Sequence, residues 1–326
     1  MLCGKIPFGD IMENQNDVEL FYNFLNDLSE QFTKIYKLSY LEGVNEALNY
    51  LLDDTIQTEV TPEDLSMFSK EKAKVSEVTF DKESIRKAYQ LAMLQGFKYD
   101  QITNAQMTPD SIGIFIAYLI KKLYGKHFPQ VLLDPLIGTG NLLATVANHS
   151  ETPFEVIGID DDPLMCALSR NIYDALSMKN QVFCQDTISY QSQPVDMIVT
   201  DFPPDKVDDK FGYFPYPVIM HHLEHLKAGH YFLALIENRF FEQKQSALFR
   251  EKLAEKAHLF GLIKLDEGLF KNHPQSILIM KKKIDQKETI DDFLLVDLPS
   301  FTDRDAFHKA LVKMDQWFAK KEVDVQ

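Results

Sequence analysis

Two glycines, Gly138 and Gly140, stand one residue apart shortly after an acidic residue, Asp134. Asp134 ends a short apolar run, and a second apolar stretch begins after Gly140. This order predicts a strand, a tight turn and a helix N-terminus, where α/β proteins bind nucleotides because glycine lets the backbone approach the ligand. The third glycine of a dinucleotide motif and the Gly-Lys-Ser/Thr of a P-loop are both missing. Taken alone, the segment is either a nucleotide-binding turn of another kind or an ordinary βα turn.

Acidic residues also follow the next three apolar runs. Asp160 and Asp161 stand at the end of the second run, Asp186 follows the third, and Asp201 ends the fourth. Parallel strands end at one edge of a sheet, where doubly wound folds bind their ligands. An acid after the second strand characteristically accepts hydrogen bonds from ribose hydroxyls, and Asp186 is placed to meet an adenine amino group. Four acids at successive strand ends, beside the glycine turn, therefore favour a nucleoside ligand over ordinary turns.

A mostly parallel sheet is needed to position these acids. Seven apolar runs are predicted strands: 131–134, 156–160, 181–184, 197–201, 231–237, 259–265 and 276–280. Helical stretches are expected between the first six, which predicts a doubly wound α/β sheet. The connection 266–275 is too short for a parallel crossover, so the seventh strand is expected to run antiparallel to the sixth. Seven strands with an antiparallel last one resemble the class I methyltransferases that use S-adenosylmethionine (SAM).

The pattern changes twice along the chain. Apolar residues recur at helical spacing before residue 100, and Thr61 and Asp81 are predicted to cap helix starts. We therefore expect a helical N-terminal domain at 1–104, the methyltransferase domain at 105–285, and a strand and helix extension at 286–326 packed on the core.

Composition narrows the possible functions. Of the 326 residues, 34 are Lys or Arg and 49 are Asp or Glu, giving a net charge of −15, which disfavours tight independent binding to duplex nucleic acid.

No apolar stretch approaches the roughly 18 residues of a membrane helix, and residues 1–13 lack the pattern of a secretory signal. Cys3, Cys166 and Cys184 form no C-x-x-C pair. They are expected to be reduced thiols of a cytoplasmic protein rather than zinc ligands.

Several short motifs follow one another between residues 106 and 283. They are Gln-Met-Thr-Pro at 106–109, the glycine turn, Asp160, Asp186, Leu-Lys-Ala-Gly at 226–229, Phe-Arg-x-x-Leu at 249–253 and Gln-Ser-Ile-Leu-Ile-Met-Lys-Lys at 275–282. In this order they resemble the adenine-N6-type DNA methylases, especially the modification subunit of type I restriction systems and its small stand-alone bacterial relatives. The resemblance implies SAM as the cofactor. It assigns SAM binding to Thr108, Asp134, Gly138, Gly140, Asp160, Asp161 and Asp186.

The motif after the fourth strand departs from this family. In the family this motif reads Asn or Asp, then Pro-Pro and an aromatic residue. The Asn or Asp side chain and the carbonyl of the next proline accept the two amino hydrogens of the base, and the aromatic ring stacks on the flipped base. Here Asp201 keeps the acceptor position, Phe202 replaces the first proline, Pro203 keeps the second, and Pro204 replaces the aromatic residue. The resemblance therefore implies Asp201, Phe202 and Pro203 as the catalytic positions, without a stacking ring at its usual place.

Two nearby segments have competing interpretations. The aromatic segment 211–216 either supplies the missing ring or only covers the edge of the sheet. Residues 221–225 read His-His-Leu-Glu-His, which matches the inverted zinc-peptidase pattern H-x-x-E-H. This segment falls on the predicted helix before the fifth strand, so we interpret it as a solvated or packed helix face and expect no metal.

The leading hypothesis is transfer of a methyl group from SAM to an amino nitrogen, with adenine in nucleic acid favoured by the resemblance. Asp201 would position the amino group and could deprotonate it. One alternative is a SAM-binding regulatory or docking protein without DNA methylation; another is an amino or amide methyltransferase acting on RNA, protein or a small molecule. No separate target-recognition domain is evident, which favours either these alternatives or a specificity partner protein. The acidic chain alone is expected to bind nucleic acid weakly.

Overall fold

The computed structural model describes residues 15–101, 107–191, 193–204, 207–208, 212–269, 273–285, 287–290 and 292–323, so Gln106 of the Thr-Pro motif lies outside them. The chain divides into two compact units. One comprises Met1–Asn104 and Ala167–Ser177, and the other comprises Ala105–Cys166 and Met178–Gln326. The stretch Ala167–Ser177, which the sequence analysis placed in the methyltransferase domain, thus groups with the helical unit.

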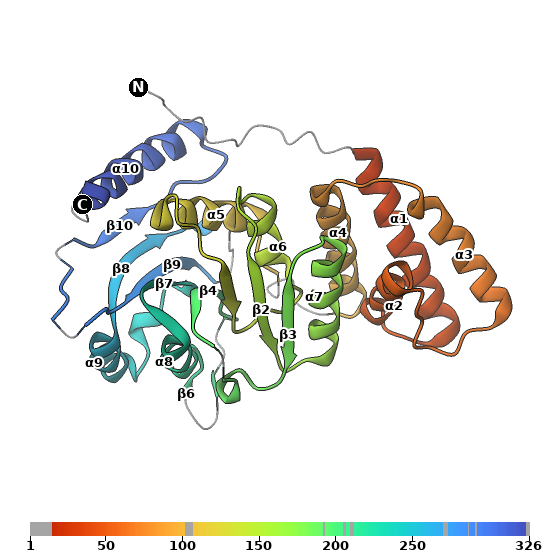
Figure 1. Cartoon of the computed structure of the whole chain (residues 1–326), viewed down its shortest axis with the longest axis horizontal. Coiled ribbons are helices and arrows are strands. Elements are labelled where there is room, and N and C mark those ends of the chain that lie inside the picture. Colours follow the sequence, from red (N-terminus) through yellow and green to blue (C-terminus); the bar gives the residue numbers. More distant parts are fainter. Residues whose placement is uncertain are drawn as a thin grey trace. The chain divides into compact units, whose positions relative to one another are not determined.

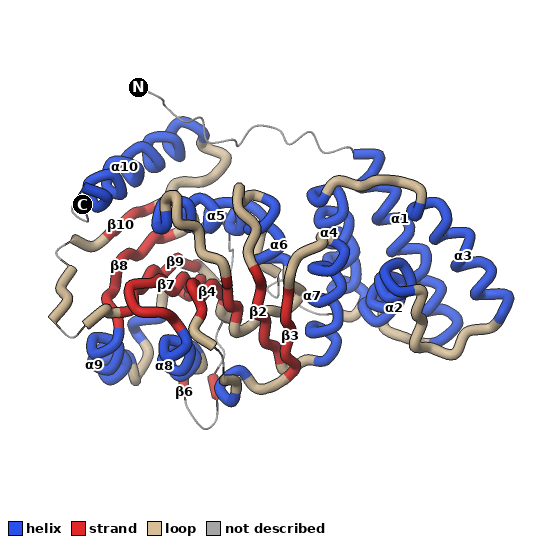
Figure 2. The backbone as a smooth tube through the Cα atoms, in the orientation of Figure 1, coloured by secondary structure: helices blue, strands red, loops and turns tan. Residues whose placement is uncertain are grey.

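Every described element of the first unit is helical, as the apolar spacing predicted (Figures 1 and 2). The elements are α1 (Gln15–Gln31), a π-helical turn (Phe32–Tyr36), α2 (Tyr40–Asp53), α3 (Pro62–Ser76), α4 (Lys82–Tyr99) and most of α7 (Pro163–Ala175). The predicted caps Thr61 and Asp81 are confirmed, because each side chain accepts a hydrogen bond from the backbone N–H three residues later. The Asn171 amide of α7 donates to Asn45 at 2.9 Å and to Asn49 at 2.8 Å, which ties α7 to α2.

The second unit contains an eight-stranded sheet in the order β3-β2-β1-β4-β7-β9-β8-β10. The strands are β1 (Val131–Asp134), β2 (Glu155–Asp160), β3 (Asn180–Cys184), β4 (Val195–Asp201), β7 (Leu226–Glu237), β8 (Ala257–Lys264), β9 (Gln275–Lys282) and β10 (Leu294–Asp297). All neighbours from β3 to β7 are parallel, so their carboxyl ends meet at one edge. A separate short hairpin joins β5 (Val207–Asp208) to β6 (Gly212–Tyr213).

The antiparallel seventh strand is confirmed: β9 runs antiparallel to β8, and it inserts between β7 and β8. Two expectations need correction. The sheet has eight strands rather than seven, because β10 adds parallel to the outer edge of β8, where the buried Leu294 packs over Gly261. The connection from β3 to β4 carries only a 3₁₀ turn, Thr187–Ser189, instead of a helix. Few residues separate these strands, and an extended chain covers the distance without a helix.

Helices cover both faces of the sheet in this unit (Figure 1). The helices α5 (Asp110–Tyr124), α6 (Asn141–Asn148) and α10 (Arg304–Val323) lie on one side, and α8 (Pro215–His225) and α9 (Ser246–Lys256) on the other. The Tyr118 hydroxyl of α5 donates to Asp315 of α10 at 2.6 Å, and Lys122 pairs with the same carboxylate at 2.8 Å. These contacts fasten the C-terminal helix to the core. Among the described residues, no helix combines the length and apolarity needed to cross a membrane.

Candidate functional site

The glycine turn forms the strand, turn and helix start that its sequence predicts. Asp134, the last residue of β1, accepts a hydrogen bond from the Leu136 N–H at 3.0 Å. Gly138 and Gly140 have φ values of 50° and 78°, which a residue with a Cβ adopts only with strain. Gly140 precedes α6, and its N–H donates to the Ile137 carbonyl at 2.9 Å. The chain therefore turns tightly between the end of β1 and the N-terminus of α6.

Asp160 holds this turn from the neighbouring strand. Its Oδ2 atom accepts the Gly138 N–H at 2.9 Å, and its Oδ1 atom accepts the Asp162 N–H at the same distance. Partial burial raises the pKa of Asp160 above its usual value, and the charges of Asp161 and Asp162 act in the same direction. Each carboxylate oxygen can accept a second hydrogen bond, so Asp160 can still receive hydroxyl donors from a ligand.

Asp201 connects three further elements. The Thr108 hydroxyl, just before α5, donates to Asp201 Oδ2 at 2.8 Å, and the Asn141 amide of α6 donates to the Thr108 carbonyl at 3.2 Å. Burial raises the pKa of Asp201 to about 7, against the opposing effects of Thr108 and of the Gln275 side chain at the start of β9. The Thr-Pro segment, the glycine turn and the end of β4 are thus brought together.

Asp134 lies within the same group of acids and is only 1% exposed. Burial raises its pKa to about 7, and the negative charges of Asp201 and Asp160 act in the same direction. The charges of Asp160 and Asp201 thus oppose ionisation of the buried Asp134 between them, which favours a positively charged ligand, because a cation would relieve both the repulsion and the unfavourable burial of charge. The arrangement suits a cationic ligand that also carries hydroxyl donors.

The remaining predicted binding residues lie on loops beside this group. Asp161 is exposed directly after β2. Asp186 is exposed after β3, and its carboxylate accepts the Ile188 N–H at 3.0 Å, which starts the 3₁₀ turn. The contacts of Gln275 with Asp201 and of Asn141 with Thr108 were not predicted from the sequence. Gln275 is the first residue of the family motif at 275–282, and Asn141 directly follows Gly140 of the glycine turn, so both lie in or next to segments that the sequence had marked as functional.

The residues after Asp201 are built into the core. The Phe202 side chain is 2% exposed, and its N–H donates to the Leu235 carbonyl of β7 at 3.1 Å. The Phe202 ring therefore cannot meet a substrate, although it anchors the end of β4. Pro203 and Pro204 are partly buried. Of the three predicted catalytic residues, only Asp201 places a polar side chain beside the other acids at the strand ends.

The aromatic residues after the hairpin are buried rather than presented to a ligand. Tyr213 and Phe214 are 4% and 7% exposed. The Tyr213 ring lies edge-on to Tyr216, with centroids 5.0 Å apart, and Tyr216 stacks on Phe249 at 4.2 Å. This geometry favours the interpretation that the segment covers the sheet. Phe211, the first ring of the segment, lies outside the described residues.

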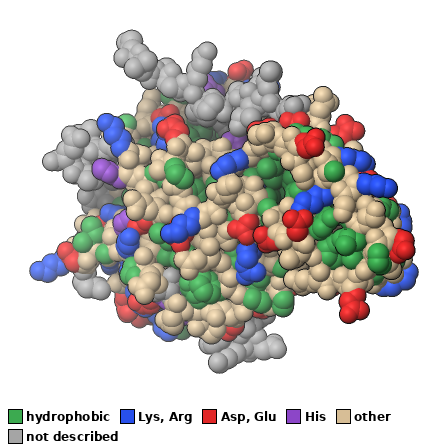
Figure 3. Space-filling view, turned by 45° about the vertical axis from the view of Figure 1, so that its right-hand side comes forward, with side chains coloured by type: hydrophobic (Ala, Val, Ile, Leu, Met, Phe, Trp, Pro, Cys, Tyr) green, Lys and Arg blue, Asp and Glu red, His purple; other side chains and the backbone are tan. Residues whose placement is uncertain are grey.

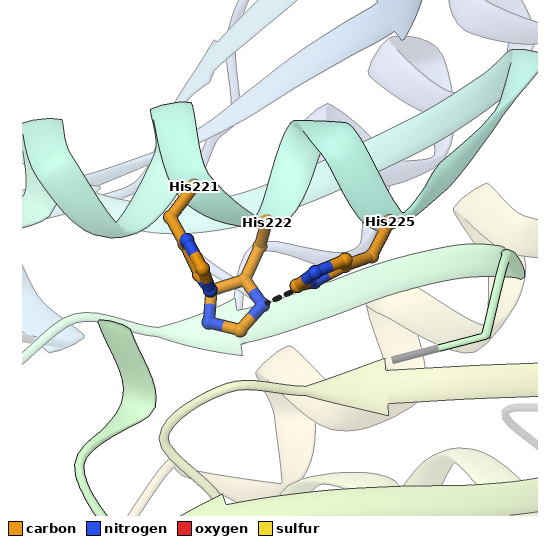
Figure 4. Close-up of side chains that lie close together, drawn as sticks. All are labelled: His221, His222 and His225. Carbon is orange, nitrogen blue, oxygen red and sulfur yellow. Dashed lines mark hydrogen bonds between the residues drawn. The ribbon is translucent and has the colours of Figure 1, made fainter. Parts of the chain in front are cut away.

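Three histidines of α8 gather on one side of the helix (Figure 4). His221, His222 and His225 each bring one ring nitrogen to within 4.8 Å of the others. Glu224, the acid of the inverted zinc-peptidase pattern, forms an ion pair with Lys256 instead. The expected packed helix face is present, because His222 and His225 are both buried. Glu224 pairs with Lys256 and is not part of the histidine group, so the arrangement lacks the acid that the zinc-peptidase pattern uses as its general base.

One face of the molecule gives little sign of a nucleic-acid binding surface (Figure 3). On the face drawn in Figure 3, basic and acidic side chains are interspersed, and no broad basic patch is visible among the described residues. This mixed face agrees with the net charge of −15. Strong independent binding to phosphate backbones would need a concentration of Lys and Arg.

Comparison with known proteins places these features in context. Residues 19–97 match the YtxK N-terminal helical domain, and residues 88–324, more than half of the chain, match the N-6 DNA Methylase family. YtxK of Bacillus subtilis strain 168, a protein of uncharacterised function, is 31% identical over 328 residues, which cover 94% of this chain and 99% of that protein.

Solved structures are similar over nearly the whole chain. A protein of Listeria monocytogenes, provisionally assigned as a class I SAM-dependent methyltransferase, is 27% identical with a TM-score of 0.84, covering 93% of this chain and 99% of that chain. The methyltransferase subunit of a type I restriction-modification system from Streptococcus thermophilus is 16% identical with a TM-score of 0.62, covering 93% and 74%. At this lower identity the likeness concerns the fold.

Proposed function

Because the chain belongs to the N-6 DNA Methylase family and is a SAM-dependent methyltransferase, we propose that it methylates an exocyclic amino group of the adenine-N6 type. The observation that carries this proposal is the hydrogen bond between Thr108 and Asp201. It joins the Thr-Pro segment to the acceptor at the end of β4, beside the buried carboxyl group of Asp134.

The residues at the strand ends fit SAM. Its sulfonium is cationic, which suits the buried carboxyl group of Asp134 and the neighbouring acids Asp160 and Asp201. When bound, SAM supplies a methyl group on a positively charged sulfur. Asp160 would receive the ribose hydroxyls, and Asp186 the adenine amino group. The turn at Gly138 and Gly140 gives the backbone close access to the ligand.

Asp201 is the residue that would receive the methyl acceptor. Thr108 donates to one of its carboxylate oxygens, Oδ2, and the Gln275 side chain also bonds to this carboxylate, yet lone pairs remain on its oxygens to accept an amino hydrogen. The family pattern assigns the second amino hydrogen to the Pro203 carbonyl. Two acceptors fix the direction of the nitrogen lone pair, and alignment of this kind accounts for much of the rate of a transfer from a strong donor. The buried Phe202 ring holds the strand end in position for both acceptors.

An unpaired or already exposed base is the substrate state that these features support. Flipping a base out of a duplex costs a few kcal/mol, part of which a stacking ring normally offsets. Pro204 offers no aromatic face, and the Tyr213 and Phe214 rings are buried. Duplex substrates would therefore need a partner protein that supplies basic surface and sequence specificity.

A second candidate function is SAM-dependent regulation or docking without methylation of DNA. The burial of Tyr213 and Phe214 favours it, because neither of these rings is presented to a base. This candidate retains the strand-end acids and the glycine turn. It differs from the first in predicting SAM binding without transfer to nucleic acid.

Methyl transfer from radiolabelled SAM distinguishes the two. Wild-type protein is incubated with separate pools of single-stranded DNA, duplex DNA, RNA, protein and metabolites, and the label in each pool is counted. We expect the wild type to transfer label to unpaired nucleic acid. Asp201→Asn keeps a hydrogen-bond acceptor, so its rate of transfer should stay within about tenfold of the wild type, whereas Asp201→Ala should lower the rate about 100-fold. SAM binding with no label in any pool would favour the regulatory candidate. Wild-type activity in Asp201→Ala would remove Asp201 from the mechanism.

A further inference from the structure

The histidine group of α8 has the dimensions of a metal site. His222 Nδ1 lies 3.4 Å from His225 Nδ1, as the dashed line in Figure 4 marks. Two imidazole nitrogens bound to one Zn²⁺ at about 2.0–2.1 Å in tetrahedral geometry are about 3.3–3.4 Å apart. The observed pair therefore already has the separation of two ligands of one ion. His221 brings a third nitrogen within 4.8 Å, and it is the only one of the three that is not buried, so its ring has room to adjust.

The outer contacts of the three rings support the same interpretation. The Nε2 atoms of His221, His222 and His225 lie 2.7 Å from the Tyr190 carbonyl, 2.8 Å from the Thr187 hydroxyl and 3.5 Å from the Gln191 side-chain oxygen. Metal-binding histidines typically donate their second ring N–H to an oxygen in this way, which orients the ring. For His222 and His225 the remaining nitrogen is Nδ1, and these two atoms are the pair that lies 3.4 Å apart.

This pattern leaves an electrostatic problem between two of the rings. If His222 and His225 donate from Nε2, their Nδ1 atoms face each other with lone pairs at 3.4 Å. A cation between them would remove the repulsion. Thr187 and Gln191 belong to one short segment, so that an ion bound to α8 would also fasten this segment, which begins directly after Asp186.

We propose that His221, His222 and His225 bind one divalent transition-metal ion of the Zn²⁺ class, with a structural role. Three nitrogen ligands leave a fourth position for water. Hydrolytic chemistry does not follow, because Glu224 pairs with Lys256. From the sequence we expected no metal here. The proposal differs because the structure adds His222, which the zinc-peptidase pattern does not use, to His221 and His225. It is independent of the proposed methyl transfer, since it uses none of the strand-end acids.

Metal analysis of the full chain tests the proposal. The protein is produced without a histidine tag, stripped with a chelator, incubated with Zn²⁺ and separated from free metal before elemental analysis. We expect one zinc per chain in the wild type and a higher melting temperature with zinc than without. His221→Ala should lose the zinc and the shift in melting temperature. The matched control is His308→Ala, which removes an exposed histidine of α10 and should behave as the wild type.

Two further measurements separate metal binding from a hydrogen-bonded histidine group. Thr187→Val keeps the side-chain shape but removes the outer contact of His222, and it should weaken zinc affinity about 10- to 100-fold. Co²⁺ in place of Zn²⁺ should give visible absorption bands typical of tetrahedral nitrogen ligands. Zinc below the level of one ion per several chains in the wild type, or equal zinc content in His221→Ala and wild type, would overturn the proposal.

Discussion

Thr108 and Asp201 are 93 positions apart in the sequence, yet the Thr108 hydroxyl donates to the Asp201 carboxylate at 2.8 Å. The bond lowers the pKa of Asp201 in opposition to burial, which raises it to about 7. It also restricts the orientation of the carboxylate, to which the Gln275 side chain makes a second bond. The start of α5 thus affects both the charge and the orientation of the acceptor at the end of β4.

The first prediction removes this hydrogen bond. Thr108→Val should raise the pKa of Asp201, because the donor that favours the ionised carboxylate is lost. The acidic limb of the pH–rate profile should move to higher pH, and turnover at pH 7 should fall about tenfold. Thr145→Val is the control, since the Thr145 hydroxyl bonds to its own helix at Asn141. An unchanged pH profile in Thr108→Val would argue against the ionised Asp201 as the acceptor.

The second prediction concerns SAM affinity. Asp160→Ala should weaken SAM binding by about tenfold or more, because it removes the ribose acceptor and the bond that holds Gly138. Asp297→Ala is the matched control, since Asp297 also ends a strand but lies on β10 at the opposite side of the sheet. Calorimetry gives both affinities. Full SAM affinity in Asp160→Ala would refute the assignment of this residue.

The third prediction follows from the raised pKa of Asp134. The pKa of Asp134 is about 7 in the folded chain, well above the value of 3.8 for an unperturbed aspartate. Between these values the folded state binds more protons than the unfolded state, so the free energy of unfolding should decrease as the pH rises from about 4 to about 7. Asp134→Asn should remove this contribution and be more stable than the wild type at pH 8 by at least about 1 kcal/mol.

Urea unfolding of the protein without SAM, at pH 5 and pH 8, measures this effect. The amide oxygen introduced by Asp134→Asn would still accept the Leu136 N–H, so the turn should survive the substitution. A variant that is equally or less stable than the wild type at both pH values would contradict the prediction.

The sequence predicted the sheet better than it predicted the contacts at the site. Short apolar runs identified seven of the eight strands of the sheet, including the antiparallel β9, because local apolar patterns determine these elements. The edge strand β10 was predicted as a strand of the C-terminal extension, but its place in the sheet was not, since pairing with β8 depends on a partner distant in sequence. The strand-end acids were located from topology. The hydrogen bond of Thr108 and the amide of Gln275 act across long sequence separations, which no local pattern encodes.

The fourth prediction separates packing from base stacking at Tyr213. The buried Tyr213 ring packs against Tyr216 and Phe240, so Tyr213→Ala should lower the free energy of unfolding by about 3–5 kcal/mol. Tyr213→Phe keeps the ring and should be close to the wild type. Thermal unfolding and methyl transfer are measured together. Reduced turnover with unchanged stability and SAM affinity in Tyr213→Ala would instead support a stacking role in the aromatic segment.

The fifth prediction concerns binding to duplex DNA. The chain carries a net charge of −15, and the acids at the strand ends concentrate negative charge where a substrate must approach. At about 0.1 M salt the screening length is about 10 Å, so this repulsion still acts on phosphates next to the site. We expect a dissociation constant for duplex DNA no tighter than the roughly 10⁻⁴–10⁻⁶ M of non-specific contacts. Single-stranded DNA should compete better, because its bases need no flipping. Fluorescence anisotropy with matched duplex and single strands measures both. Nanomolar, sequence-specific duplex binding by the isolated chain would refute the prediction, because the protein would then need neither an exposed base nor a basic partner.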